Sequence, residues 1–180
     1  MGNILIKNIT AVTMSDSSGV IENAYIVING NLIEYIGKEK PETEDFDYVI
    51  DGENKVVMPG LVNTHTHLAM TLLRSYADDM NLQDWLFNKI FPFEDKLMAD
   101  DILKGSEIGV DEMLAGGTTC FNDMYMFQAE TGRVALKKGI RAVLSDCVNF
   151  DGYDRKVKLM ETMAEEFKNE EDRKSTRLNS

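Results

Sequence analysis

Short apolar runs separated by turn-forming residues fill the first part of the chain. Each run combines β-branched or aromatic residues with flanking Gly, Asn, Asp or Ser, which is the pattern of β-strands. The predicted strands are residues 4–9, 11–14, 25–28, 32–36, 48–51 and 55–57. Asn29-Gly30-Asn31 lies between two of them and predicts a hairpin. Residues 1–57 are therefore expected to form a small all-β portion.

The pattern changes after Pro59-Gly60, where apolar segments of strand length begin to alternate with longer segments of helical spacing. A short helix is expected to open at Leu82 and to end at Pro92, because proline interrupts a helix. This alternation predicts parallel β–α–β units and an α/β fold, with too few strands to close an eight-stranded barrel. The expected strands are residues 61–67, 118–123 and 140–145, and the expected longer helices are residues 99–114, 128–138 and 154–169.

Composition and charge narrow the class of protein. With 43% hydrophobic and 28% charged residues, the 180-residue chain has the composition of a globular domain. Its 19 basic and 31 acidic residues leave a net charge of −12, which argues against nucleic acids and anionic membranes as partners. The chain has no apolar stretch long enough to span a bilayer, and its first residues lack the features of a signal peptide. A cytoplasmic location is the expectation.

Residues 172–180, with the sequence DRKSTRLNS, differ from the rest of the chain. They turn basic after an acidic helix and show no apolar pattern. The segment resembles the translation of a sequencing-library adapter, and a solvated basic end of the helix is the alternative interpretation. We therefore expect a non-native tail and leave it out of the fold assignment.

His65 and His67 are the only histidines in the sequence, and they directly follow an apolar segment. Residues i and i+2 of a β-strand point to the same face, so two imidazoles at this spacing can bind one divalent metal ion. A polar role at the end of a strand is the alternative. The ends of parallel strands are where α/β folds build their sites, which favours metal ligation. The further ligands must then come from elsewhere.

The segment around these histidines resembles a known family. The string VMPGLVNTHTHL, residues 57–68, is similar to the first barrel strand of the amidohydrolase superfamily, whose HxH motif supplies two metal ligands. The continuation to Leu97, with its LLR, W-L and P-x-E-D-x-L elements, resembles the deaminases of 5'-methylthioadenosine and S-adenosylhomocysteine and their chlorohydrolase relatives. The resemblance runs over residues 1–171.

This resemblance implies a metal-dependent (β/α)₈ barrel with one divalent ion, zinc first and iron as the alternative, and a β-sandwich built from both chain ends. Residues 1–57 would belong to the sandwich, and residues 58–171 would form the first three β/α units. In the family, a His after the fifth strand, a His after the sixth, an Asp after the eighth and a barrel Glu complete the site. All four would lie beyond residue 171, so no catalytic residue is assigned and the 180 residues alone are expected to be inactive.

The resemblance also implies that Glu94 binds substrate by accepting hydrogen bonds from ribose hydroxyls. The alternative is an acidic residue in the first turn of a helix after Pro92, stabilised by the helix dipole. Trp85, the only tryptophan, is the second candidate substrate-binding residue, because it can stack on a purine. A lone aromatic residue on an amphipathic helix is more often part of the core.

Asp123 and Asp146 end the next two predicted strands. Asp123 is expected either to support the metal ligands or to cap a turn or helix. Related deaminases often present a basic residue at the position of Asp146. An acid there argues against a substrate with a carboxylate tail, such as S-adenosylhomocysteine.

Together these features predict the N-terminal piece of an aminohydrolase that converts an adenosine-type nucleoside to its inosine form and releases ammonia. The expected partner is a small nucleoside, and a homo-oligomer of the full-length protein is left open. Another amidohydrolase activity, on a nucleobase, a cyclic amide or a halogenated triazine, is the first alternative. A truncated module without catalytic activity is the second.

Overall fold

The computed structural model describes residues 2–42, 45–146, 153–167 and 176–178. The chain divides into two compact units, Met1–Pro59 and Gly60–Ser180. Each unit has its own sheet, and the two are considered separately here. Among the helices of the described ranges, none combines the length and the apolar character needed to cross a lipid bilayer.

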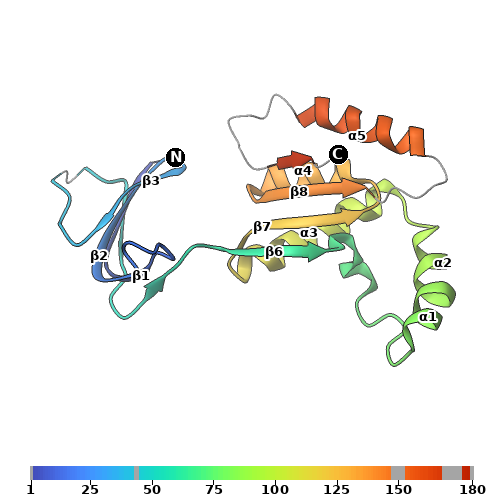
Figure 1. Ribbon diagram of the computed structural model, residues 1–180, viewed down its shortest axis with the longest axis horizontal. Coiled ribbons are helices and arrows are strands. Elements are labelled where there is room, and N and C mark those ends of the chain that lie inside the picture. The colour runs from blue at the N-terminus through green and yellow to red at the C-terminus, as the bar shows by residue number, and fades with distance from the viewer. Residues whose placement is uncertain (1, 43–44, 147–152, 168–175, 179–180) are drawn as a thin grey trace. The chain divides into compact units, whose positions relative to one another are not determined.

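The first unit is a five-stranded mixed sheet (Figure 1). Its strand order is β3-β2-β1-β4, with β5 also paired to β1, and only the β4 and β5 pairings are parallel. The predicted hairpin is confirmed, because Asn29 pairs with Leu32 across Gly30, whose φ is +60°. The strands are β1 (Asn3–Val12), β2 (Val20–Asn29), β3 (Leu32–Gly37), β4 (Tyr48–Asp51) and β5 (Val56–Val57).

The predicted start of β2 at Tyr25 was wrong, because the strand begins at Val20. The polar residues Glu22 and Asn23 hide this part of the strand in the sequence, yet the segment pairs with the end of β1. Asn23 has φ of +54°, so the strand is irregular where the alternation of apolar residues is lost. Pairing with β1 therefore decides this strand rather than local preference.

The second unit contains a parallel sheet in the order β6-β7-β8-β9. Helices connect the strands, which confirms the predicted parallel β–α–β units (Figure 1). The strands are β6 (Leu61–Thr66), β7 (Thr118–Tyr125), β8 (Arg141–Asp146) and β9 (Thr176–Leu178). The longer helices are α3 (Ala99–Ala115), α4 (Gln128–Lys138) and α5 (Tyr153–Phe167). β9 lies within residues 172–180, whose adapter-like origin stays a prediction.

The core of this unit lies between the sheet and the helices α3 and α4. Phe121 and Leu144 from the strands pack with Val110 and Val134 from the helices, and all four are buried. A short 3₁₀-helix, η1 (Leu68–Leu73), follows β6 directly and adds Leu68 to this core. The helix η1 was not predicted, because its sequence LAMTLL is too short and too apolar to show a helical period.

Helix α3 allows η1 to approach closely because a glycine faces it. A Cβ built on Gly105 would lie 2.6 Å from the carbonyl oxygen of Ala69, closer than real Cβ atoms come. The Thr71 hydroxyl donates a 2.7 Å hydrogen bond to the carbonyl of Gly105. The segment after β6 is therefore held directly against α3.

The predicted helix end at Pro92 was also wrong. Residues 82–94 are helical throughout, as α1 (Leu82–Trp85), a π-helical turn η2 (Leu86–Ile90) and α2 (Phe91–Glu94). The N–H of Phe91 bonds to the carbonyl of Leu86, five residues earlier, and Pro92 then occupies the first turn of α2. Pro92 has no N–H to donate, and it follows the place where the regular i→i−4 hydrogen bonds are already interrupted by the π turn.

Candidate metal and substrate site

His65 and His67 lie at the carboxyl end of β6. Their ring centroids are 5.1 Å apart with the rings at 79° to each other, although β6 ends at Thr66 and only His65 belongs to the strand. His65 is exposed, whereas His67 is half-buried and precedes η1 as its N-cap residue. The two imidazoles are therefore adjacent at the edge of the sheet where sites in parallel folds are built.

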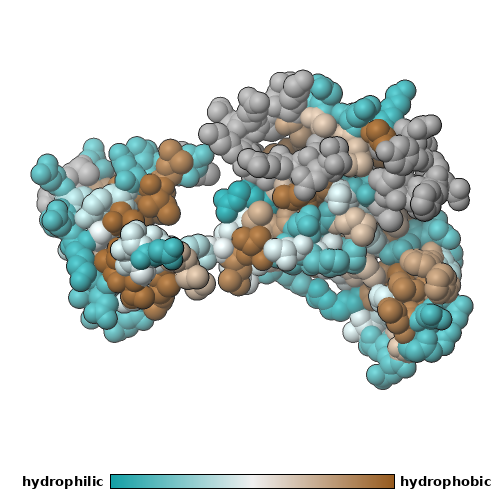
Figure 2. All heavy atoms as spheres, viewed as in Figure 1, coloured by the Kyte–Doolittle hydropathy of each residue, from teal (hydrophilic) through white to brown (hydrophobic). Residues whose placement is uncertain are grey.

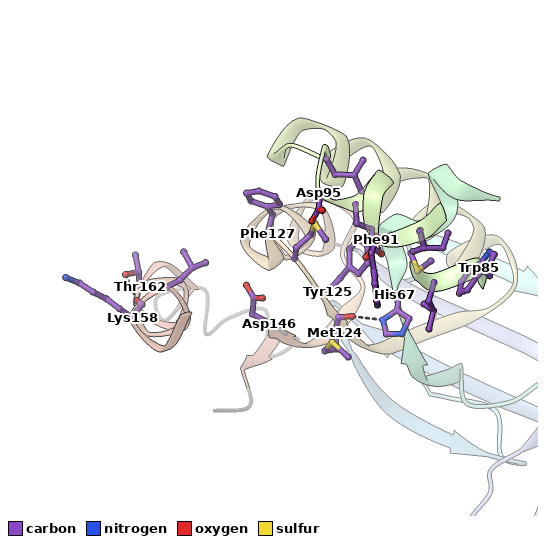
Figure 3. A pocket seen from close by; sticks show the side chains of 17 residues that line it. His67, Trp85, Phe91, Asp95, Met124, Tyr125, Phe127, Asp146, Lys158 and Thr162 are labelled. Carbon is purple, nitrogen blue, oxygen red and sulfur yellow. Dashed lines mark hydrogen bonds between the residues drawn. The ribbon is translucent and has the colours of Figure 1, made fainter. Parts of the chain in front are cut away.

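The ring of His67 is oriented by the neighbouring strand. Its Nδ1 lies 2.6 Å from the carbonyl oxygen of Met124 in β7, drawn as the dashed line in Figure 3. A carbonyl only accepts hydrogen bonds, so Nδ1 is the donor, and in a neutral imidazole Nε2 is then the nitrogen with the lone pair. Metal-ligating histidines are held in this way by a hydrogen bond from the other ring nitrogen.

Asp123 fixes the backbone just after His67. Its Oδ1 accepts a 2.7 Å hydrogen bond from the N–H of Leu68, the first residue of η1, and its side chain is buried. Burial raises the pKa of Asp123 above its ordinary value, against the hydrogen bonds from Gln128 and Leu68 that lower it. Asp123 thus holds the first residue of η1, next to His67, and its support of a metal ligand stays a prediction.

Gln128 is a buried partner that the sequence did not reveal. Its Nε2 donates a 2.7 Å hydrogen bond to Oδ2 of Asp123. Within the described residues, its Oε1 has no hydrogen-bond partner. A glutamine at the first position of a helix carries no sequence signal for such a role.

Trp85 and Glu94 lie before and after a π-helical turn. They are 94 − 85 = 9 residues apart, which on a regular α-helix is about two and a half turns and places them on opposite sides. The turn η2 lies between them and changes the helical phase. Both residues line one pocket, and Figure 3 labels Trp85 among its side chains.

Glu94 is bound by a tyrosine that the sequence analysis missed. The hydroxyl of Tyr125, at the end of β7, donates a 2.6 Å hydrogen bond to Oε1 of Glu94. Burial and the neighbouring Glu94 raise the pKa of Tyr125 well above its ordinary value, so the hydroxyl stays a donor at neutral pH. Tyr125 lies two residues after Asp123, at the end of β7, and this position in the sequence could have indicated that it belongs to the site.

The pocket itself has a volume of about 990 Å³, at the upper end of the usual range for small-molecule sites. His67, Trp85, Glu94 and Asp146 line it, whereas His65 contacts the ring of His67 from beside the pocket. Methionine and aromatic side chains supply most of the remaining wall, and Figure 3 shows Phe91, Met124 and Phe127 among them. The pocket thus combines the imidazole of His67 just after β6, the carboxylate of Asp146 at the end of β8 and an apolar wall.

The donor chemistry fits a divalent metal ion in part. Two adjacent imidazoles, one with its tautomer fixed, are suitable ligands for zinc or iron. Within the part of the chain that the structure describes, no group of three or more His, Cys, Asp or Glu side chains is placed to hold an ion. A stable site therefore needs ligands besides His65 and His67.

A comparison with protein-family models identifies the family of the chain. The model of the amidohydrolase family matches residues 56–179, which include both histidines, the pocket helices and all three longer helices. The chain belongs to the amidohydrolase family. The α/β unit described above is thus part of an amidohydrolase fold, as the resemblance of the histidine segment implied.

The chain is similar to several curated proteins. It is 47% identical over 142 residues to a 5-methylthioadenosine/S-adenosylhomocysteine deaminase of Syntrophomonas wolfei, covering 79% of this chain and 33% of that protein. It is 47% identical over 144 residues to a 5'-deoxyadenosine deaminase of Methanosarcina barkeri, with 80% and 33% covered. The chain therefore spans about a third of the length of these curated relatives.

A solved structure supports the fold assignment. The amidohydrolase chain superimposes on the crystal structure of an adenosine deaminase from Xanthomonas campestris, which has bound zinc, with a TM-score of 0.79. The sequences are 26% identical, and the match covers 97% of this chain and 41% of that one.

Proposed function

We propose that the complete protein is a metal-dependent aminohydrolase that deaminates an adenosine-type nucleoside, such as 5'-methylthioadenosine, S-adenosylhomocysteine or adenosine. The product is the corresponding inosine form, with release of ammonia. The observation that carries the proposal is the meeting of His67 and Glu94 in one pocket, an imidazole for a metal ion and a carboxylate for a sugar. The names of the relatives at 47% identity support the nucleoside as substrate.

The proposed architecture of the whole protein extends the two units described here. Residues 58–171 would form the first three β/α units of a (β/α)₈ barrel, and residues 1–57 part of a composite β-sandwich. Residues 172–180 would be the adapter-like tail. The missing metal ligands and the acid–base glutamate would come from later barrel strands. A homo-oligomer of the full-length protein stays a prediction.

The ion is proposed to be zinc, with iron as the alternative. His65 and His67 would hold it, with His67 using Nε2 because Nδ1 is bound to Met124. When bound, a divalent ion would lower the pKa of water to about 7, which makes an attacking nucleophile available at neutral pH. The zinc found in the related adenosine deaminase structure supports this choice.

Glu94 and Trp85 are proposed to bind the substrate. Glu94 would accept hydrogen bonds from ribose hydroxyls, and the indole of Trp85 would form part of the purine wall. Asp146 lines the same pocket, and a negative charge there disfavours a substrate with its own carboxylate. We therefore rank 5'-methylthioadenosine and adenosine above S-adenosylhomocysteine.

The test is the activity of the complete protein encoded at this locus, supplied with zinc and assayed for ammonia release. We expect turnover of 5'-methylthioadenosine and adenosine, and little or none of free adenine, cytosine or a chlorinated triazine. Preference for a base or a triazine would replace this function with another amidohydrolase activity. A zinc-loaded protein inactive on all of them would favour the non-catalytic module.

A further inference from the structure

The contact between Tyr125 and Glu94 links the two halves of the pocket. Glu94 lies on the helical segment 82–94, and Tyr125 ends β7, which also orients His67. The 2.6 Å hydrogen bond joins residues 31 positions apart. No local feature of the sequence requires it, so it is a product of how the helical segment packs on the strand ends.

Tyr125 is rigidly held. It is 6% exposed and packs in a core cluster with Ala69, Leu97 and Ile102. The preceding residue, Met124, accepts the hydrogen bond from the ring of His67. Met124 thus contacts His67 through its backbone carbonyl, and the next residue of β7, Tyr125, contacts Glu94 through its phenol.

Glu94, in contrast, depends on this contact for its orientation. It lies in a four-residue helical turn without fully buried residues, and a free glutamate side chain has several accessible rotamers. With Oε1 bound to Tyr125, the carboxylate is fixed, and Oε2 remains to accept from a ligand in the pocket. Fixing a ligand-binding group in advance strengthens binding, because less conformational entropy is lost on association.

We infer that Tyr125 is a positioning residue for sugar recognition: it holds Glu94 so that one carboxylate oxygen faces the vicinal hydroxyls of a bound ribonucleoside. This inference rests on the proposed function and deepens it. It assigns the discrimination between a ribose with vicinal hydroxyls and a sugar without them to a pair of residues rather than to Glu94 alone.

The experiment compares adenosine with 2',3'-dideoxyadenosine in the zinc-loaded full-length protein. In Tyr125→Phe, which keeps the ring and loses the hydroxyl, we expect kcat/KM for adenosine to fall about tenfold, as for loss of one hydrogen bond to a charged group. The value for the dideoxy substrate should change less than about twofold, and the zinc content should not change. Tyr76→Phe is the matched control, because Tyr76 also packs near the helical segment, against Phe93, but lies outside the pocket.

If Tyr125 had a purely structural role, Tyr125→Phe would lower kcat/KM equally for both substrates. That result would overturn the inference while leaving deamination intact. Failure of the wild-type protein to turn over any nucleoside would overturn the proposed function and the inference together. If Tyr125→Phe does not fold, Glu94→Asp decides, because a side chain shorter by one methylene cannot meet both Tyr125 and the sugar. Glu94→Asp should lose the preference for adenosine, and retention of the full preference would contradict the inference.

Discussion

The two halves of the pocket are held by different means. At the strand ends, Asp123 binds the backbone N–H after His67, and the ring of His67 binds a backbone carbonyl, so the geometry depends on main-chain atoms and a buried acid. In the helical segment 82–94, all of which the structure describes, Ile90 is the one fully buried side chain. There, the hydrogen bond from the side chain of Tyr125 holds Glu94.

This difference indicates which half of the pocket tolerates substitutions. Backbone contacts within a packed core constrain position to a fraction of an ångström, as a metal site requires. A largely exposed helical segment can change its surface residues at little cost in stability, because few of them are packed. Leu82 and Phe87 are exposed apolar side chains of this segment, and Figure 2 shows apolar side chains at the surface there. We expect the strand ends to carry the chemistry and the helical segment to carry specificity.

The largest expected effect is the loss of a histidine. The full-length wild-type protein should hold about one divalent ion per chain, and His65→Ala or His67→Ala should abolish both metal binding and deamination, because too few ligands remain. Metal analysis and ammonia release measure this, with Thr66→Ala as the control between them. A full equivalent of zinc in either histidine variant would show that the strand end is not the metal site.

The next effect concerns the buried support. Asp123→Ala should lower metal affinity about 10–100-fold, the usual cost of removing a residue that orients a ligand. Asp123→Asn should lower metal affinity much less. Its amide oxygen can still accept the hydrogen bond from Leu68, and Gln128 can turn its unpaired Oε1 to accept from the new amide N–H. Zinc titration of both variants measures the difference. Equal losses would mean that the negative charge matters rather than the cap.

On the other half of the pocket, Glu94→Gln should lower kcat/KM for 5'-methylthioadenosine about tenfold to a hundredfold, because hydrogen bonds to a charged group are worth about 1.5–3 kcal/mol. Metal content should stay unchanged, since Glu94 is not a ligand. Free adenine, which has no ribose, should show little dependence on this residue if it reacts. Equal losses on both substrates would assign Glu94 a structural role.

The smallest effects are on stability and contrast the two halves directly. Gly105→Ala places a Cβ against the backbone of η1 and should lower the free energy of unfolding by about 1–3 kcal/mol. Leu82→Ala in the exposed helical segment, where Leu82 is 67% exposed, should change it by less than about 0.5 kcal/mol. Thermal or denaturant unfolding of the full-length variants measures both. A larger cost for Leu82→Ala would show that the helical segment is packed in the whole protein.

Several features of this protein follow from the sequence by itself, because they depend on residues close together along the chain. The alternation after Pro59-Gly60 predicts the parallel units, Asn29-Gly30-Asn31 predicts the hairpin, and His65 with His67 predicts adjacent rings at a strand end. In each case the deciding interactions are within a turn, within a strand or between residues two positions apart.

The assembly of the pocket depends on contacts between distant parts of the chain, which only the tertiary structure shows. Leu68 and Asp123 are 55 residues apart and Glu94 and Tyr125 are 31 apart, so neither contact shows in a local pattern. The π turn before Pro92 is likewise invisible in the sequence, although it lies between Trp85 and Glu94, which line one pocket. The physical reason is that local periodicity encodes which face of an element is buried, whereas the packing of helices on strand ends decides which side chains from distant segments meet.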